Sequence, residues 1–185
     1  MSVPPNIVDA ARHVLAEDGL AAATLERISA AAGVSRMTLH RRGVTKEEIL
    51  RTLAGQLQVA YREAFWPALV GKGTGRERLE LALRLQCEVT EENLATLQAL
   101  SDSAREAIYH DSHGLTRPEF VQPLERLLID GAADGSLRQT DPAEMATLLF
   151  NAVGHTYRHL RTGHGWKPRR ASEAVIALMM QGVAS

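Results

Sequence analysis

Apolar residues recur three and four positions apart along most of the chain, which is the spacing of helices with one buried face. No stretch shows the alternation of apolar and polar residues that is typical of a strand. Glycine, proline and polar clusters divide the pattern into segments. The pattern therefore predicts an all-α protein of about nine helices.

The pattern predicts three short helices in the first part of the chain. The first covers about residues 5–18. Thr24 can cap a second helix. Gly33 supplies the turn that follows, and Ser35 can cap a third helix that ends near Arg41. Two short helices joined by a tight turn are typical of a helix-turn-helix unit, which we expect before residue 50.

A fourth helix has the clearest predicted start. Thr45 and Glu48 have the spacing of a capping box, in which a hydroxyl and a carboxylate each accept from a free backbone amide. Val44 and Ile49 flank this box as a hydrophobic staple. The helix is expected to reach Pro67, where the proline ring should end or kink it.

Longer and more apolar helices are predicted beyond residue 70. Thr74 and Glu77 form a second capping box at the start of one helix, and Thr116 and Glu119 are expected to start another. Further helices are expected at about residues 92–101, 142–161 and 169–183.

Basic residues concentrate on the third predicted helix although the formal net charge of the chain is only −1. In the segment "SRMTLHRRG", Leu39 is expected to face inward. Arg36 and His40 lie four positions apart on one outer face, and Met37 and Arg41 lie on the next. Arginine can bind guanine edges, and methionine can contact a thymine methyl. The segment predicts local binding to double-stranded DNA rather than attraction by the whole surface.

Phosphate contacts are expected beside these base contacts. Thr38, Arg42, Lys46 and the free amides at the starts of the second and fourth helices suit phosphate oxygens. The candidate DNA-binding residues are therefore Thr24, Ser35, Arg36, Met37, Thr38, His40, Arg41, Arg42 and Lys46. The other interpretation of this strip is a solvated helix face, the usual fate of charged residues.

The stretch "TLERISAAAGVSRMTLHRRGVTKEEIL" resembles the DNA-binding region of TetR-family transcriptional regulators. The residues that match the family's pattern are Thr24, Ile28, Ala32, Gly33, Val34, Ser35, Thr38, Leu39 and Lys46. His40 replaces the family's usual tyrosine, a common phosphate contact, and Arg42 and Gly43 replace its usual His-Phe pair. We expect Val44 to fill part of the space left by the missing phenylalanine.

The resemblance implies a cytoplasmic homodimeric transcriptional regulator, and we expect a repressor. Residues 1–50 would form its helix-turn-helix DNA-binding domain, and residues 51–185 a helical domain for effector binding and dimerisation. The expected partners are a pseudo-palindromic DNA operator, a second copy of the chain and a small-molecule effector of unknown identity. Two joined half-sites would also multiply the specificity that one short recognition helix can give.

Aromatic residues of the second part have two interpretations. Pockets between the helices of a bundle are lined by such side chains, but plain core packing is their commoner fate. The candidate pocket residues are Trp66, Tyr109, Phe120, Phe150 and Tyr157.

The last two predicted helices are apolar on more than one face. Either they are central in their own domain, or they bury a second face against an identical partner. The resemblance implies dimerisation through these helices. The candidate interface residues are Leu148, Val153, Ile176 and Met179.

Other chemistry finds little support in the sequence. Cys87 lies among leucines and valine and is expected to be a buried small hydrophobe. His155 and His159 lie four positions apart, which is a spacing of metal ligands on a helix, and His110 and His113 are a second candidate pair. Neither pair is part of an HExxH motif. We therefore expect no metal and no cofactor. We expect no signal peptide, no membrane span and no catalysis. A small helical enzyme and a helical protein-interaction module remain the alternatives.

Overall fold

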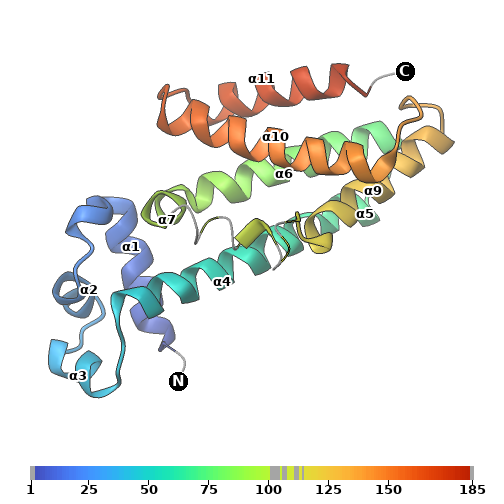
Figure 1. The fold of residues 1–185 in the computed structure, drawn as a ribbon. Coiled ribbons are helices and arrows are strands. Elements are labelled where there is room, and N and C mark those ends of the chain that lie inside the picture. Colours follow the sequence, from blue (N-terminus) through green and yellow to red (C-terminus); the bar gives the residue numbers. More distant parts are fainter. Residues whose placement is uncertain (1–2, 101–104, 106–107, 111–112, 114, 184–185) are drawn as a thin grey trace. The chain divides into compact units, whose positions relative to one another are not determined.

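The computed structural model describes residues 3–100, 105, 108–110, 113 and 115–183. These residues form ten helices and no strand beyond one isolated bridge, which confirms the all-helical class (Figure 1). The helices are α1 (Pro5–Ala22), α2 (Leu25–Ala31), α3 (Arg36–Arg41), α4 (Lys46–Ala64), α5 (Trp66–Val70), α6 (Gly75–Glu92), α7 (Leu94–Ala99), α9 (Pro118–Ala133), α10 (Pro142–Thr162) and α11 (Pro168–Gln181). Within the described part of the chain, no helix is both long and apolar enough to cross a bilayer.

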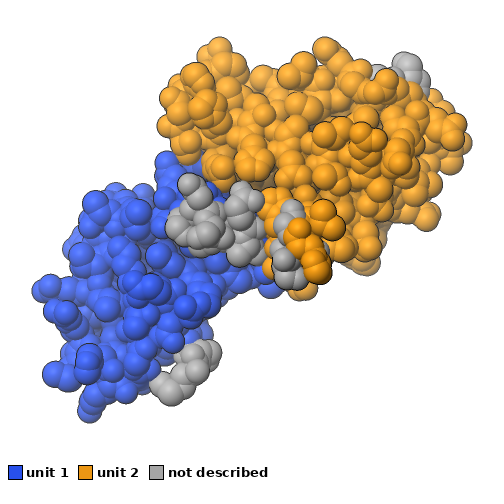
Figure 2. Space-filling model, viewed as in Figure 1, with its two compact units in different colours: residues 1–59, 93–109 blue, residues 60–92, 110–185 orange. Residues whose placement is uncertain are grey.

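The chain forms two compact units, which Figure 2 shows in different colours. Unit 1 comprises residues 1–59 and 93–109, and unit 2 comprises residues 60–92 and 110–185. Helix α4 therefore begins in unit 1 and ends in unit 2. The boundary that we expect at residue 50, between a DNA-binding and an effector-binding domain, does not coincide with these two units, and it stays a prediction.

The core of unit 1 is built from α1 to α4 together with α7. Its fully buried side chains include Ile7 and Val14 of α1, Ile28 of α2, Leu39 of α3 and Ile49 of α4. The regular geometry of α1 breaks at Gly19, whose φ of 76° lies in the left-handed region, and one more turn runs to Ala22.

The core of unit 2 is built from α6, α9 and α10, with α5 against α6 and α11 against α10 and α6. Phe120 of α9 and Phe150 of α10 stack with their ring centroids 5.2 Å apart. Tyr61 meets both rings edge to face, at 6.0 and 6.3 Å. At one end of this core α6 and α9 approach so closely that a Cβ placed on Gly75 would overlap the backbone of Gly131.

The two predicted capping boxes of α4 and α6 are present. Glu48 N donates to Thr45 Oγ1, and Thr45 N donates to Glu48 Oε2, each at 3.2 Å. Thr74 and Glu77 make the same reciprocal pair, at 2.8 and 3.2 Å. Both helices therefore start where their local sequence predicts.

The third predicted box was wrong. Helix α9 starts at Pro118, and no side chain caps its first turn. Thr116 Oγ1 instead accepts a hydrogen bond from Asn151 Nδ2 at 2.9 Å. The proline at the first helical position has no amide to satisfy, so a cap contributes less there.

Two other helix ends differ from the expectation. Helix α4 ends at Ala64, and Pro67 lies in the first turn of α5, where a proline ring is tolerated. The helix expected at residues 92–101 is the shorter α7, and residue 101 lies outside the described residues.

The close approach of α6 and α9 predicts opposite outcomes for two glycines. Gly75→Ala should lower the free energy of unfolding by about 1–3 kcal/mol, because backbone must move to admit the methyl group. Gly55→Ala should raise it by about 0.5–1 kcal/mol, because Gly55 lies inside α4 with open space around it. Urea unfolding of both variants checks this; equal effects would contradict the close packing.

Candidate nucleic-acid interface and pocket

The turn between α2 and α3 is held by backbone and side-chain hydrogen bonds. Gly33 has a φ of 67°, and the next residue, Val34, donates its N–H to the Ser29 carbonyl at 3.0 Å. Ser35 Oγ accepts from Thr38 N at 3.1 Å and lies 2.9 Å from the Thr38 hydroxyl. The predicted cap of α3 is therefore present and the start of this helix is fixed.

Helix α3 has a single buried side chain, Leu39, which is 1% exposed. After the helix Gly43 turns the chain with a φ of 63°, and Val44 N donates to the Leu39 carbonyl at 3.1 Å. Val44 and Ile49 are buried in the same core as Leu39. Val44 thus fills space in the core beside α3, as expected from the missing phenylalanine.

The rest of α3 faces solvent. Arg36, Met37, His40 and Arg41 are exposed, and Arg42 after the helix is exposed as well. None of the three arginines forms an ion pair within the described residues. Their guanidinium groups are therefore available to acceptors outside the protein.

The other candidate DNA-binding residues lie around this strip. Thr24 caps α2 by accepting from Arg27 N at 3.2 Å, and both Thr24 and Ser35 are exposed. Thr38 is half-buried. Lys46 is half-buried too, and its Nζ donates to the Leu20 carbonyl at 3.4 Å. The geometry thus places exposed hydrogen-bond donors of α3 next to the starts of α2 and α4.

This arrangement matches a known family. The model described as "Bacterial regulatory proteins, tetR family" matches residues 7–53. Residues 7–53, which contain α2, α3 and the start of α4, are therefore similar to the DNA-binding region of this family. A comparison with curated proteins gives no match.

Solved structures of TetR-type regulators share the fold. A TetR/AcrR-family regulator from Thermobifida fusca is 22% identical with a TM-score of 0.72, over 95% of each chain. PfmR from Thermus thermophilus is 21% identical with a TM-score of 0.68, over 95% of this chain and 97% of its own. FadR from Bacillus subtilis, solved in complex with stearoyl-CoA, is 20% identical with a TM-score of 0.70, over 96% of this chain and 97% of its own.

The five candidate pocket aromatics do not line one cavity. Phe120 and Phe150 fill the core of unit 2 by stacking on each other. Trp66 on α5 is 65% exposed, and Tyr109 belongs to unit 1. Only Tyr157 borders the cavity between α6, α10 and α11. For Phe120 and Phe150 the structure shows the core packing that was the other interpretation.

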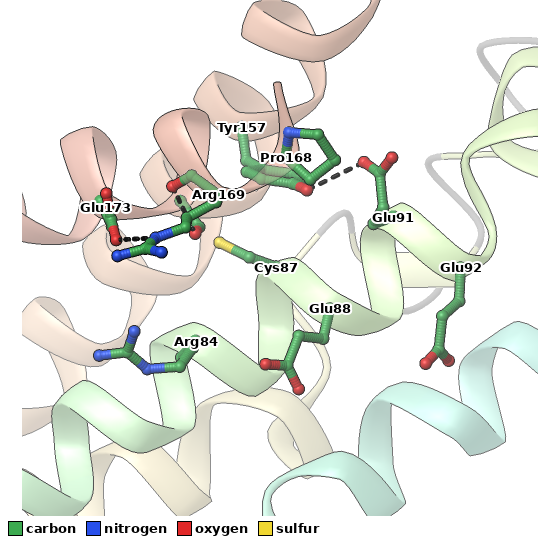
Figure 3. A pocket seen from close by; sticks show the side chains of 10 residues that line it. Arg84, Cys87, Glu88, Glu91, Glu92, Tyr157, Pro168, Arg169 and Glu173 are labelled. Atoms are coloured by element: carbon green, nitrogen blue, oxygen red, sulfur yellow. Dashed lines mark hydrogen bonds and ion pairs between the residues drawn. The ribbon is translucent and has the colours of Figure 1, made fainter. Parts of the chain in front are cut away.

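This cavity has a volume of about 470 Å³, within the range of small-molecule sites. Figure 3 shows its lining side chains: Arg84, Cys87, Glu88, Glu91, Glu92, Tyr157, Pro168, Arg169, Ser172 and Glu173. Of these ten residues, only Tyr157 is a candidate pocket residue from the sequence. Glu88, Glu91 and Glu92 on α6 and Glu173 on α11 resemble solvated helix faces in the sequence, and only the nearness of Glu88 and Glu91 to the buried Cys87 could have indicated otherwise.

A charged cluster forms one wall of the cavity. Arg161 binds both carboxylate oxygens of Glu91, at 2.6 and 2.7 Å, and Tyr157 donates its hydroxyl to Glu91 Oε2 at 2.9 Å. The Arg161 guanidinium, aided by Tyr157, holds the pKa of Glu91 below its usual 4.5. Burial, together with the bond to Glu91, raises the pKa of Tyr157. The wall therefore keeps an ionised carboxylate beside a neutral phenol.

The candidate dimer residues differ in exposure. Leu148 on α10 is 54% exposed, and Met179 on α11 is half-buried. Val153 and Ile176 are buried within the protomer, so their side chains contact their own chain. Leu178, which was not among the candidates, is 62% exposed. The interface itself stays a prediction, and the surface open to a partner lies at the exposed leucines.

The histidines form no metal cluster among the described residues. His159 makes an edge-to-face contact with His164, with ring centroids 4.9 Å apart. His155 lies 3.4 Å from an Arg158 nitrogen. These contacts tie the α10 histidines to neighbouring side chains.

The Glu91–Arg161 pair predicts a pH-dependent contribution to stability. Glu91→Gln should lower the free energy of unfolding by about 1–2 kcal/mol at pH 7, because Arg161 loses its charged acceptor. A carboxyl whose pKa is lowered by folding stabilises the protein above its unfolded pKa. The difference should therefore vanish as the pH falls from about 5 through the lowered pKa of Glu91.

Urea unfolding at pH 7 and in acid measures this effect. Glu173→Gln is the control, because its partner Arg169 is exposed to solvent and the pair adds little. If the difference in free energy of unfolding between wild type and Glu91→Gln stays the same in acid as at pH 7, lost packing and not lost charge is responsible.

Cys87 should be inert in the folded protein. Its side chain is 2% exposed, and burial raises the pKa of its thiol to about 12. Ellman's reagent should therefore react at least about 100-fold more slowly with the native protein at pH 7.4 than with the urea-unfolded protein. Cys87 is the only cysteine, so Cys87→Ser gives the blank. Equal rates would contradict the burial.

Proposed function

We propose that the chain is a DNA-binding transcriptional regulator, a repressor whose operator affinity is modulated by a small molecule. The observation that carries this proposal is the exposed strip of α3, which is fixed in place by Leu39 and by the Ser35 cap. Its arginines can bind base edges and its flanking donors can bind phosphates. The match of residues 7–53 to the tetR family model supports the same function.

A homodimer would present two copies of α3 to successive turns of the major groove. Such symmetry requires a pseudo-palindromic operator, with half-sites about one helical turn apart or a multiple of that. We place the dimer interface on α10 and α11, where Leu148 and Leu178 are exposed. The expected site of action is the cytoplasm, where the regulated DNA lies.

The effector is expected to act through unit 2. FadR, which shares the fold, was solved with stearoyl-CoA, which supports a small-molecule site in this chain. Helix α4 starts four residues after Arg42 and continues into unit 2, so it links the DNA-binding strip to the second unit. An effector that fits better when the two recognition helices are wrongly spaced would lower operator affinity by population shift.

The proposal predicts different effects for two arginines. Arg36→Ala should cost about 1–3 kcal/mol on the preferred duplex and relax base preference, because Arg36 is assigned to a base edge. Arg42→Ala should weaken binding to all duplexes alike and reduce the salt slope by about 1, because Arg42 is assigned to a phosphate. Selection from a random duplex pool, then fluorescence anisotropy at several salt concentrations, measures both.

Arg62→Ala is the matched control for these variants. Arg62 is an exposed arginine on α4, in unit 2, and should have no effect on DNA affinity. The proposal is overturned if wild-type protein prefers no duplex over bulk competitor DNA, or if Arg62→Ala weakens binding as much as Arg36→Ala does.

A further inference from the structure

We propose that the cavity between α6, α10 and α11 binds a small organic cation, an ammonium group carrying a short apolar chain. The claim that this cation is the effector rests on the proposed function. The claim that the cavity binds such a cation rests on the geometry alone. The cavity lies entirely in unit 2, and its volume of about 470 Å³ admits a molecule of that size.

The charges around the cavity favour a cation. Four carboxylates and two guanidinium groups line it. Arg84 is paired with Glu80 at 3.0 Å, and Arg169 with Glu173 at 2.7 Å. Each arginine of the lining thus already has a carboxylate partner, and the carboxylates outnumber the arginines, so the lining has a net negative charge.

Two carboxylates of the cavity are left without a cation. Glu88 and Glu92 lie one turn apart on α6, and neither has a hydrogen bond or ion pair within the described residues. Figure 3 shows both side chains extending downward from α6, below the Glu91–Tyr157 pair, with their carboxylates apart. An ammonium group near them would gain two acceptors without breaking an existing pair.

The inner wall adds polarity without adding charge. Cys87 is 2% exposed and borders the cavity, and its thiol makes no hydrogen bond within the described residues (Figure 3). Tyr157 is 1% exposed and also lines the cavity, and an aromatic ring attracts cations. A polarizable sulfur and a ring suit the carbon atoms next to an ammonium nitrogen.

A second hollow extends the cavity along α6 and α11. Arg84 and Glu173 line both hollows, so the two are neighbours. The second has a volume of about 330 Å³, and Ile176, Ala177 and Met180 supply its apolar part. A short alkyl chain attached to the ammonium group can lie there, which is why the inferred ligand is amphipathic.

Three probes with the same six-carbon chain test the inference on the full-length protein. Isothermal titration calorimetry with hexylammonium, hexanoate and hexanol separates the roles of charge and chain. Hexylammonium should bind, and the other two should bind at least about tenfold more weakly. The double variant Glu88→Gln/Glu92→Gln should lower hexylammonium affinity by about tenfold.

Glu63→Gln is the charge-matched control, because Glu63 is an exposed glutamate of unit 2 that does not line the cavity. It should change hexylammonium affinity by less than about twofold. Equal binding of hexanoate or hexanol, or an unchanged affinity in the double variant, overturns the inference.

Anisotropy with the selected duplex, on the same preparations, separates this inference from the proposed function. Duplex binding without hexylammonium binding overturns the cation site and leaves the regulator intact. Hexylammonium binding without duplex binding supports the site and overturns the regulator. Binding of both, with operator affinity lowered by hexylammonium, supports the cation as the effector class.

Discussion

The burial of Leu39 is the constraint on which the DNA-binding strip depends. Helix α3 has six residues, far fewer than an isolated helix needs to be stable in water. Its structure therefore comes from the core of unit 1 and from the bonds at its ends, at Ser35 and Val44. Because Leu39 secures the helix, the four exposed side chains of Arg36, Met37, His40 and Arg41 can meet a ligand. A polar residue at position 39 would remove both the helix and the strip.

The sequence predicts the starts of α4 and α6 well because the signals of a helix start are local. A cap and its partner lie three residues apart, and the structure contains both hydrogen bonds at Thr45–Glu48 and at Thr74–Glu77. The same pattern failed at Thr116 for two reasons. A proline opens the helix, and the hydroxyl binds Asn151, a residue 35 positions away. Local patterns fail where a distant residue competes for the same group.

The cavity could not be predicted in this way, because helices far apart in the chain form it. Phe120 and Phe150 have the composition of pocket residues, but their mutual stacking fills the space between α9 and α10. The cavity opens instead where α11 meets α6, between side chains that alone resemble a solvated face. Whether a glutamate faces bulk water or a cavity depends on how helices pack, which periodicity does not specify.

The distribution of charge along the chain also explains how one protein can have a site for an anionic ligand and a site for a cationic ligand. The net charge is only −1, yet the strip on α3 is basic and the cavity in unit 2 has an excess of carboxylates. At physiological ionic strength a charge is screened within about 8 Å, so each site presents its own local charge to a ligand. A phosphate backbone is then attracted to α3 and repelled from the cavity, and a small cation has the reverse preference. Separating the charges in space therefore keeps each ligand out of the other's site, which a uniform surface of the same net charge could not do.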